Sequence, residues 1–405
     1  MDSREIKIIN IIPSKSYAHR ALICDHLAGG DGTGVVCDLD SDDITATRAC
    51  LKALEDGGSV LMCGESGSTL RFMLPLAGAL GREVRLEMRG RLAERPMGPL
   101  EDELSRHGMT ISHEDVAICA GGQLEPGTYR LPGSISSQFI TGLLLSLPYL
   151  EGDSVIELTS DLRSSAYVDI TIDVLRQYGV DIQKEDRRFL IPGKQRYKRK
   201  EPYTVEGDWS QAAFWLAAGA AGSCPVGVTG LKRDSVQGDR AIEEILRSFG
   251  AEITWERLVD DSDVIVAFPS RLHPSVVDIA EVPDLAPAVA AAAAAAAGDT
   301  RIINAGRLRL KESDRIESIV SCLEDAGVSA EADNDEIIIH GTGHCAGGEA
   351  ETAGDHRIVM MAAVLSLISD NTTVIHGSSA VAKSYPSFFS EMKKAGLADN
   401  LITER

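Results

Sequence analysis

The stretch Leu246-Arg247-Ser248-Phe249-Gly250-Ala251 contains the end of an amphipathic helix, a glycine and the start of a strand. Glycine suits this place because helices commonly end beside a residue with a left-handed backbone. The same pattern returns along the chain, so that its glycines stand roughly 70 residues apart. This spacing predicts six repeated units, three in each of two halves. Close copies occupy residues 104–109, 175–180 and 323–328, and weaker copies end at Gly57-Gly58 and at Gly396.

Length and charge limit the possible functions. A chain of 405 residues is too long for one ordinary hydrophobic core, so two domains are expected. The formal net charge of −21 opposes binding to nucleic acid or to an anionic membrane surface. In so acidic a protein, an anionic substrate would require a local pocket of Arg and Lys side chains.

One alanine-rich stretch indicates how the core is built. Residues 288–297 are all alanine except Val289. Alanine is the best helix former, and a helix without a polar face is normally buried. Pro283-Asp284 and Gly298-Asp299 stand at its ends like helix boundaries, which favours a buried helix over a flexible linker. Together with β-rich runs at residues 84–88 and 154–158, this predicts an α/β protein.

Other segments exclude several classes of protein. The first five residues, MDSRE, lack the basic and apolar regions of a signal peptide, and the longest apolar stretches are about half of the ~20 residues that span a bilayer. Eight scattered cysteines without a C-x-x-C pair are typical of reduced thiols in the cytoplasm. The acidic run at residues 38–43 lacks the glycine of a calcium loop and is interpreted as a helix start capped by Ser41.

Several short segments concentrate cationic and small polar residues. Taken singly, each could be a solvated helix start, a turn or a surface loop with weak ion pairs. Residues 64–71 form a Gly/Ser loop before a helix, which suits an anion, but they lack the ending of a nucleotide P-loop. All of them together in an acidic protein imply a small substrate with several negative charges. The segments are residues 13–20, 64–71, 89–96, 134–139, 307–315, 355–357 and 383–386.

In this order and spacing, the segments resemble the enolpyruvyl transferases that act on shikimate 3-phosphate, the 5-enolpyruvylshikimate-3-phosphate (EPSP) synthases. The resemblance extends from Lys15 to Lys383. The motifs that carry it are Lys15-Ser16 with Arg20, Gly67 with Arg71, Glu94-Arg95-Pro96, Ser136-Ser137-Gln138-Phe139, Glu206-Gly207-Asp208, Gln237-Gly238-Asp239, Pro283-Asp284, Lys311-Glu312-Ser313-Asp314-Arg315, Asp355-His356-Arg357 and Ala382-Lys383.

The resemblance implies a fold of two inverse α/β barrels, each made of three βαβαββ repeats with helices inside and sheets outside. One domain would comprise residues 14–206, the other residues 1–13 and 207–405, with the active site in the cleft between them. The implied reaction transfers the enolpyruvyl group of phosphoenolpyruvate (PEP) to the 5-hydroxyl of shikimate 3-phosphate, with release of phosphate, in the shikimate pathway to chorismate. It implies no metal, no cofactor, a cytoplasmic monomer and inhibition by glyphosate.

The resemblance also implies roles for individual residues. Asp284 would be the base for the hydroxyl and Glu312 the acid and base for the methylene carbon, with Lys15 and Lys383 assisting. The implied contacts of shikimate 3-phosphate are Lys15, Ser16, Arg20, Ser136, Ser137, Gln138, Ser164, Tyr167, Asp284, Arg307 and Lys311. The implied contacts of PEP are Lys15, Gly67, Arg95, Gln138, Arg315, Arg357 and Lys383.

The chain departs from the family pattern at three places. Glu65 and Arg307 replace residues that are Asn in most or some relatives, and the usual glycine between Pro13 and Ser14 is absent. These departures affect local contacts rather than the reaction.

Two alternatives stay open. The transferases that act on UDP-N-acetylglucosamine commonly have Cys five residues before the loop arginine, where this chain has Gly90. The Ser136-Ser137-Gln138 segment also favours the shikimate branch. A non-catalytic ligand-binding relative is disfavoured because Asp284 and Glu312 are both retained.

Overall fold

Four sheets share one strand order and one pattern of orientation. In each, the first two strands in the sheet are parallel and the other neighbouring pairs are antiparallel. The computed structural model in which they occur describes residues 5–199 and 201–404. Shorter sheets pair β2 with β11, and β20 with β19 and β21, in parallel. The four orders are β3-β4-β6-β5, β7-β8-β10-β9, β1-β12-β14-β13 and β15-β16-β18-β17.

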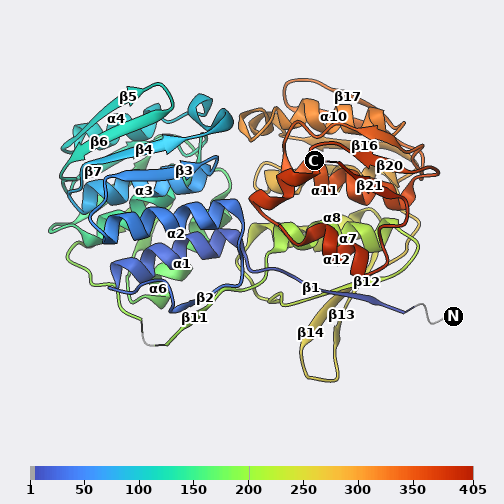
Figure 1. The fold of residues 1–405 in the computed structure, drawn as a ribbon, viewed down its shortest axis with the longest axis horizontal. Coiled ribbons are helices and arrows are strands. Elements are labelled where there is room, and N and C mark those ends of the chain that lie inside the picture. The colour runs from blue at the N-terminus through green and yellow to red at the C-terminus, as the bar shows by residue number, and fades with distance from the viewer. Residues whose placement is uncertain (1–4, 200, 405) are drawn as a thin grey trace. The chain divides into compact units, whose positions relative to one another are not determined.

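The described chain divides into two compact units (Figure 1). The N-terminal unit contains residues 13–199 and 201–205, and the C-terminal unit contains residues 5–12 and 206–404. Residues 1–4 and 405, which the expected second domain included, lie outside the described residues. The strand β1 at the start of the chain completes a sheet of the C-terminal unit, because it pairs with β12.

The elements of the N-terminal unit alternate between strands and helices. Its strands are β2 (Val35–Val36), β3 (Val60–Gly64), β4 (Val84–Met88), β5 (Met109–Glu114), β6 (Ala117–Gly122), β7 (Thr128–Leu131), β8 (Ser154–Leu158), β9 (Gln183–Lys184), β10 (Arg188–Ile191) and β11 (Tyr203–Thr204). Its helices are α1 (Lys15–Leu27), α2 (Asp42–Glu55), α3 (Gly67–Ala79), α4 (Gly98–Arg106), α5 (Ser137–Ser146) and α6 (Ser165–Gln177).

The C-terminal unit has the same alternation. Its strands are β1 (Lys7–Asn10), β12 (Val226–Thr229), β13 (Glu252–Arg257), β14 (Asp263–Phe268), β15 (Val276–Asp278), β16 (Gly298–Ile303), β17 (Ser329–Ala332), β18 (Glu336–Gly341), β19 (Gly348–Ala350), β20 (Thr373–Ile375) and β21 (Leu401–Thr403). Its helices are α7 (Trp209–Ala221), α8 (Ile242–Ser248), α9 (Ala286–Ala294), α10 (Arg315–Asp325), α11 (His356–Leu365) and α12 (Phe388–Lys394).

The helix–glycine pattern predicted from the sequence is confirmed in all six copies. Each repeat glycine follows an even-numbered helix and has a φ angle between 70° and 96°. Glycine adopts this left-handed conformation without steric cost, so it ends the helix and turns the chain toward the next strand. The six glycines are Gly57, Gly108, Gly179, Gly250, Gly327 and Gly396.

The odd-numbered helices lie in the interior. In α9, every residue from Ala286 to Ala294 is buried, which confirms the buried alanine helix predicted from the sequence. The helix α7 is buried from Trp209 to Ala220, and α11 is buried throughout. Because α9 presents almost only the small side chains of alanine, α7 and α11 pack closely against it. The β-rich runs predicted at residues 84–88 and 154–158 are the strands β4 and β8.

A glycine in α5 permits close packing against α3. A Cβ atom at Gly142 would lie 2.3 Å from the backbone oxygen of Arg71 in α3 and 3.0 Å from Cγ of Pro75. We therefore expect Gly142→Ala to reduce the free energy of unfolding by about 1–3 kcal/mol, the usual cost of overpacking a core.

Urea denaturation would measure this change, and Gly98→Ala is the matched control. Gly98 is exposed at the start of α4, and a Cβ atom there would meet nothing within 4 Å. Alanine at this position should leave stability unchanged or raise it by up to about 1 kcal/mol. Equal effects of the two substitutions would contradict the packing argument.

Candidate active site

Three buried helices of the C-terminal unit begin at carboxylates. The helices α7, α9 and α11 contact one another. Asp208 is the N-cap of α7, and its side chain accepts hydrogen bonds from the backbone N–H groups of Ser210 and Gln211. Asp284 lies in the single 3₁₀ turn Pro283–Leu285 that leads directly into α9. Asp355 caps α11, so packing these helices together also brings their polar ends together.

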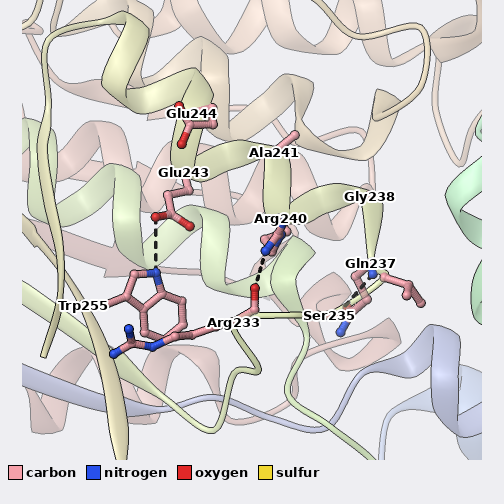
Figure 2. A pocket seen from close by; sticks show the side chains of 10 residues that line it. Arg233, Ser235, Gln237, Gly238, Arg240, Ala241, Glu243, Glu244 and Trp255 are labelled. Atoms are coloured by element: carbon pink, nitrogen blue, oxygen red, sulfur yellow. Dashed lines mark hydrogen bonds between the residues drawn. The ribbon is translucent and has the colours of Figure 1, made fainter. Parts of the chain in front are cut away.

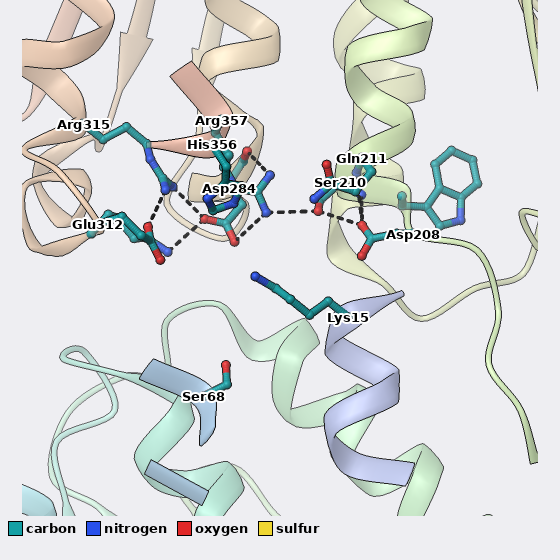
Figure 3. A network of polar contacts seen from close by, with 12 residues as sticks. Lys15, Ser68, Asp208, Ser210, Gln211, Asp284, Glu312, Arg315, His356 and Arg357 are labelled. Carbon is teal, nitrogen blue, oxygen red and sulfur yellow. Dashed lines mark hydrogen bonds and ion pairs between the residues drawn. The ribbon is translucent and has the colours of Figure 1, made fainter. Parts of the chain in front are cut away.

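Three cations surround Asp284 (Figure 3). Its Oδ1 atom lies 2.9 Å from Nζ of Lys311 and 3.1 Å from Nη1 of Arg315. Its Oδ2 atom lies 3.3 Å from Nη2 of Arg357, which is also 3.1 Å from Oγ of Ser210. Asp284, the segment that holds Lys311 and Arg315, and Arg357 come from three separate motifs of the sequence, and the fold brings the three cations to one carboxylate.

Asp355 holds Arg315 in place from the other side. The carboxylate of Asp355 is fully buried and accepts from Nε of Arg315 at 2.8 Å and from Nη2 at 3.3 Å. The same Nη2 atom donates to Oε2 of Glu312 at 2.5 Å. Ser313 donates to Asp355 as well. The guanidinium of Arg315 thus connects Asp284, Glu312 and Asp355, and its orientation is determined by all three.

The cations fix the ionisation of these carboxylates. Burial alone would raise the pKa of Asp284, but Arg357, Lys311 and Arg315 hold that pKa well below its usual value. Burial alone would also raise the pKa of Asp355, but that pKa is lowered, mainly by the positive charge of Arg315. Burial also lowers the pKa of Lys311, and the positive charges of Arg315 and Arg307 contribute in the same direction, against Asp284 and Glu312. Arg307 is therefore close enough to influence this cluster.

Lys383 ends the 3₁₀ segment Ser378–Lys383. Its Nζ atom donates to the backbone oxygen of Gly354 at 3.0 Å, directly before Asp355 in the chain. The predicted residues of the C-terminal unit therefore lie on or beside the starts of α9, α10 and α11.

The N-terminal unit also presents polar residues where buried helices begin. Lys15 is the first residue of α1, Gly67 the first of α3 and Ser137 the first of α5. The helix α5 contacts both α1 and α3. Ser41 caps α2, which confirms the helix start predicted there, and Ser136 caps α5 by accepting from the N–H of Gln138. Helix N-termini carry partial positive charge and free N–H groups, which favour anions.

The amide of Gln138 in α5 binds two side chains of α3 that lie close to Gly67 in the sequence. Its Oε1 atom accepts from Nη1 of Arg71 at 2.8 Å, and its Nε2 atom donates to Oγ of Ser68 at 2.9 Å. A Cβ atom at Gly67 would lie 2.6 Å from Nη1 of Arg71 and 2.7 Å from Nη1 of Arg95. Two guanidinium groups therefore lie against the backbone of Gly67.

Arg20, an expected contact of shikimate 3-phosphate, is buried at 3% exposed. Its guanidinium donates to the hydroxyl of Thr171 at 2.8 Å and to the backbone oxygens of Ser16 and Tyr167 at 2.5 and 3.0 Å. Burial lowers the pKa of Arg20 to about 10, although nearby tyrosines act to raise it. Ser164, also buried, caps α6 with a left-handed backbone at φ 54°. In this structure Arg20 ties α1 to α6.

The sequence interpretation missed several partners of the predicted residues. Asp43 was assigned only to a helix start, which is correct, but its Oδ2 atom also lies 2.7 Å from Nζ of Lys15. Arg71, Asp355 and Ser210 had no assigned role. Arg71 and Asp355 stood in the motifs that carry the resemblance, which was the only available signal.

A separate cavity of about 550 Å³ in the C-terminal unit is lined by none of the residues predicted to bind substrate or to act in catalysis (Figure 2). Its charged groups are engaged with neighbours: Arg233 lies over the ring of Trp255 and beside Asp263, and Glu243 accepts from Nε1 of Trp255. Within residues 5–199 and 201–404, no group of three or more His, Cys, Asp and Glu side chains could hold a metal ion. In the same ranges, no helix combines the length and apolar character needed to cross a membrane.

Comparison with known proteins identifies relatives of the whole chain. The family model described as EPSP synthase (3-phosphoshikimate 1-carboxyvinyltransferase) matches residues 54–392. The 3-phosphoshikimate 1-carboxyvinyltransferase of Clostridium kluyveri is 41% identical over 96% of this chain and 94% of its own. That of Clostridioides difficile is 36% identical over the same shares. The structure of EPSP synthase from Acinetobacter baumannii superposes with a TM-score of 0.76 at 25% identity, covering 98% of this chain and 96% of that one.

The buried pair of Arg315 and Asp355 generates a prediction about stability. Asp355→Asn should lower the free energy of unfolding at pH 7 by about 3 kcal/mol or more, because a buried guanidinium loses the carboxylate that binds two of its atoms. Folding lowers the pKa of Asp355, so its contribution is complete above the ordinary value of 3.8 and is lost as pH falls through the folded-state pKa.

Urea denaturation between pH 7 and pH 3 should therefore show parent and variant converging at the acid end. Asp299→Asn removes an exposed carboxylate paired with His340 and is the control, with an expected change below about 1 kcal/mol. A difference between Asp355→Asn and the parent that stays constant down to pH 3 would argue against the pairing.

Proposed function

The chain belongs to the EPSP synthase family, the 3-phosphoshikimate 1-carboxyvinyltransferases, and from this premise we infer how its residues carry out enolpyruvyl transfer. It is an enzyme of the shikimate pathway that transfers the enolpyruvyl group of PEP to shikimate 3-phosphate. The observation that carries the assignment of residues is the convergence of Lys311, Arg315 and Arg357 on Asp284.

The cations of this cluster suit the anionic groups of the substrates. The guanidinium of Arg357 or Arg315 can bind a carboxylate or phosphate through two parallel hydrogen bonds, and the ammonium of Lys311 supplies a compact charge. We assign PEP to Arg315, Arg357 and Lys383, and shikimate 3-phosphate to Lys311 and Arg307. On the N-terminal unit we assign PEP to Lys15, Gly67, Arg95 and Gln138, and shikimate 3-phosphate to Lys15, Ser16, Arg20, Ser136, Ser137, Gln138, Ser164 and Tyr167.

Substrate binding should also activate Asp284. A carboxylate with a strongly lowered pKa is a weak base. Anionic substrates compete for Lys311, Arg315 and Arg357, and as those contacts are exchanged the pKa of Asp284 rises toward the range useful for proton transfer. Without substrates, Asp284 holds the three cations together; with substrates bound, it can act as a base.

The chemical steps then need two carboxyl groups. In the first step Asp284 accepts the proton of the 5-hydroxyl of shikimate 3-phosphate while the hydroxyl oxygen bonds to the phosphate-bearing carbon of PEP. Glu312 delivers a proton to the methylene carbon of PEP. In the second step the bond between the phosphate-bearing carbon and the phosphate oxygen breaks, and Glu312 takes back a proton from the methyl group. The departing phosphate carries away the proton that Asp284 accepted. Lys15 and Lys383 assist by stabilising negative charge.

We also propose the finer architecture and setting. Burial of α3 and α5 in the N-terminal unit and of α7, α9 and α11 in the C-terminal unit supports an inverse barrel in each, with helices inside and sheets outside and with boundaries near Pro13 and Glu206. Eight free thiols support the cytoplasm as the compartment. Assignment of all catalytic groups to one chain supports activity as a monomer.

Asp284→Asn and Glu312→Gln should each lower kcat by roughly 100-fold or more, the usual effect of losing a positioned acid or base. Asp284→Asn should not raise KM for PEP, because the amide no longer competes for the three cations. Glu317→Gln, in the first turn of α10, is the control, since Glu317 is exposed and its carboxylate pairs only with Arg309 among the described residues.

The measurement is phosphate release from PEP with shikimate 3-phosphate as acceptor, and with UDP-N-acetylglucosamine in its place. Turnover of the sugar nucleotide instead of shikimate 3-phosphate would overturn the assigned acceptor. Normal turnover by either folded variant would remove that residue from the mechanism.

Glyphosate should inhibit this enzyme in competition with PEP, and Gly67→Ala should raise its inhibition constant more than KM for PEP. The added methyl group would come within 2.7 Å of the guanidinium nitrogens of Arg71 and Arg95, so both must move away from the ligand. Glyphosate is longer than PEP and should depend more on the space beside Gly67.

Steady-state inhibition constants for the parent, Gly67→Ala and Gly98→Ala would measure this difference. Gly98→Ala adds a methyl group where nothing lies within 4 Å, so both constants should stay at the parent values. Equal losses for glyphosate and PEP in Gly67→Ala would mean that the methyl group merely distorts the loop.

A further inference from the structure

A buried chain of hydrogen bonds crosses three helices of the N-terminal unit. Nδ1 of His19 in α1 lies 2.8 Å from Oγ1 of Thr47 in α2. That hydroxyl lies 2.7 Å from Oγ1 of Thr69 in α3. Thr69 then donates to Oγ of Ser66 at 2.8 Å and to the backbone oxygen of Asp43 at 3.3 Å. His19, Ser66 and Thr69 lie within two of the cationic segments, but none of the residues of this chain of hydrogen bonds was assigned a role in catalysis or substrate binding.

The geometry gives the chain a direction. A backbone oxygen can only accept, so Thr69 uses its one hydroxyl proton toward Asp43 and Ser66. Thr47 must then donate to Thr69, which leaves its own oxygen to accept from His19. The imidazole of His19 therefore carries its proton on Nδ1, and its other nitrogen, Nε2, is buried with no hydrogen-bond partner among the described residues.

The surroundings of His19 keep it neutral. It is 1% exposed, and its ring meets that of Phe72 edge to face with centroids 6.1 Å apart. Burial lowers the pKa of His19 well below 6.5, and the charges of Lys15 and Arg20 lower it further. A second proton on Nε2 would have no acceptor there. His19 is thus a fixed donor of one hydrogen bond rather than a charged group.

Both ends of the chain reach residues assigned to PEP binding. Asp43, whose backbone oxygen accepts from Thr69, pairs through its carboxylate with Lys15 at 2.7 Å. Ser66, the other acceptor, is the N-cap of α3 and immediately precedes Gly67. The hydroxyl of Thr47 therefore connects His19 in α1 with Thr69, which contacts the neighbours of two residues assigned to PEP, Lys15 and Gly67.

We propose that Thr47, held by His19, is a positioning residue for enolpyruvyl transfer that fixes the Lys15–Asp43 pair relative to the turn at Gly67. It acts through Thr69 and does not touch the substrates. The inference rests on the proposed roles of Lys15 and Gly67 in PEP binding. Because small displacements of binding groups are costly, loss of this hydroxyl should affect substrate binding beyond its effect on stability.

The test compares three variants of the full-length chain. Thr47→Val keeps the shape and removes the hydroxyl, and it should raise KM for PEP about tenfold with a smaller change in kcat. Thr47→Ser restores the hydroxyl and should return KM to within about twofold of the parent. Thr300→Val makes the same change in the buried strand β16 of the C-terminal unit, and it should lower the melting temperature without moving KM.

Unchanged KM in Thr47→Val, with a melting temperature lowered as in Thr300→Val, would overturn the proposal, because the chain would then serve stability alone. Failure of Thr47→Ser to restore KM would also count against it. Lys15→Met separates this result from the proposed function: if it leaves KM for PEP unchanged, the role of Lys15 is wrong, whatever the Thr47 variants do.

A second pair of variants covers the case in which Thr47→Val does not fold. His19→Asn retains an N–H donor near the position of Nδ1 and should keep KM near the parent value, whereas His19→Leu removes the donor and should raise it. Nitrogen-15 NMR of the histidine-labelled parent should show His19 protonated on Nδ1. Protonation on Nε2 would overturn the assigned direction, and equal KM values for the two variants would overturn the positioning role.

Discussion

The packing of α7 and α11 against the alanine helix α9 is the constraint on which the site depends. In the C-terminal unit, α7, α9 and α11 are in mutual contact, and α9 has almost nothing but alanine to present to its neighbours. Their starts carry Asp208, Asp284 and Asp355. Larger side chains on these helices would separate the three starts, and the cations that bridge them would lose their common partner.

The carboxylates and cations at these starts are therefore mutually dependent. Arg315 is 1% exposed and tolerates burial because Asp284, Glu312 and Asp355 all bind it. Asp284 keeps its charge because three cations outweigh the effect of burial on its pKa. Pairing with Asp284, Glu312 and Asp355 thus keeps Lys311, Arg315 and Arg357 together at one place in a protein whose net charge is −21.

In the N-terminal unit, hydroxyls and amides take part in holding the cationic side chains in position. The starts of α1, α3 and α5 carry Lys15, Gly67 and Ser137, and the groups behind them are mostly neutral. Arg71 is oriented by Gln138, and Lys15 by Asp43. Neutral hydrogen bonds such as that between His19 and Thr47 fix positions without adding charge, which suits a unit where cations already lie beside Gly67.

The sequence by itself determined the local features. The repeat glycines, the alanine helix, the strands β4 and β8 and the cap at Ser41 depend on residues close together in the chain, so propensity and periodicity were enough to predict them. The likeness of motifs also predicted which residues form the site. Only the tertiary structure decided which of them touch: Arg357 meets Asp284 and Arg71 meets Gln138 across 73 and 67 residues. Those contacts follow from how each buried helix is rotated and how closely it packs, and local sequence does not encode either quantity.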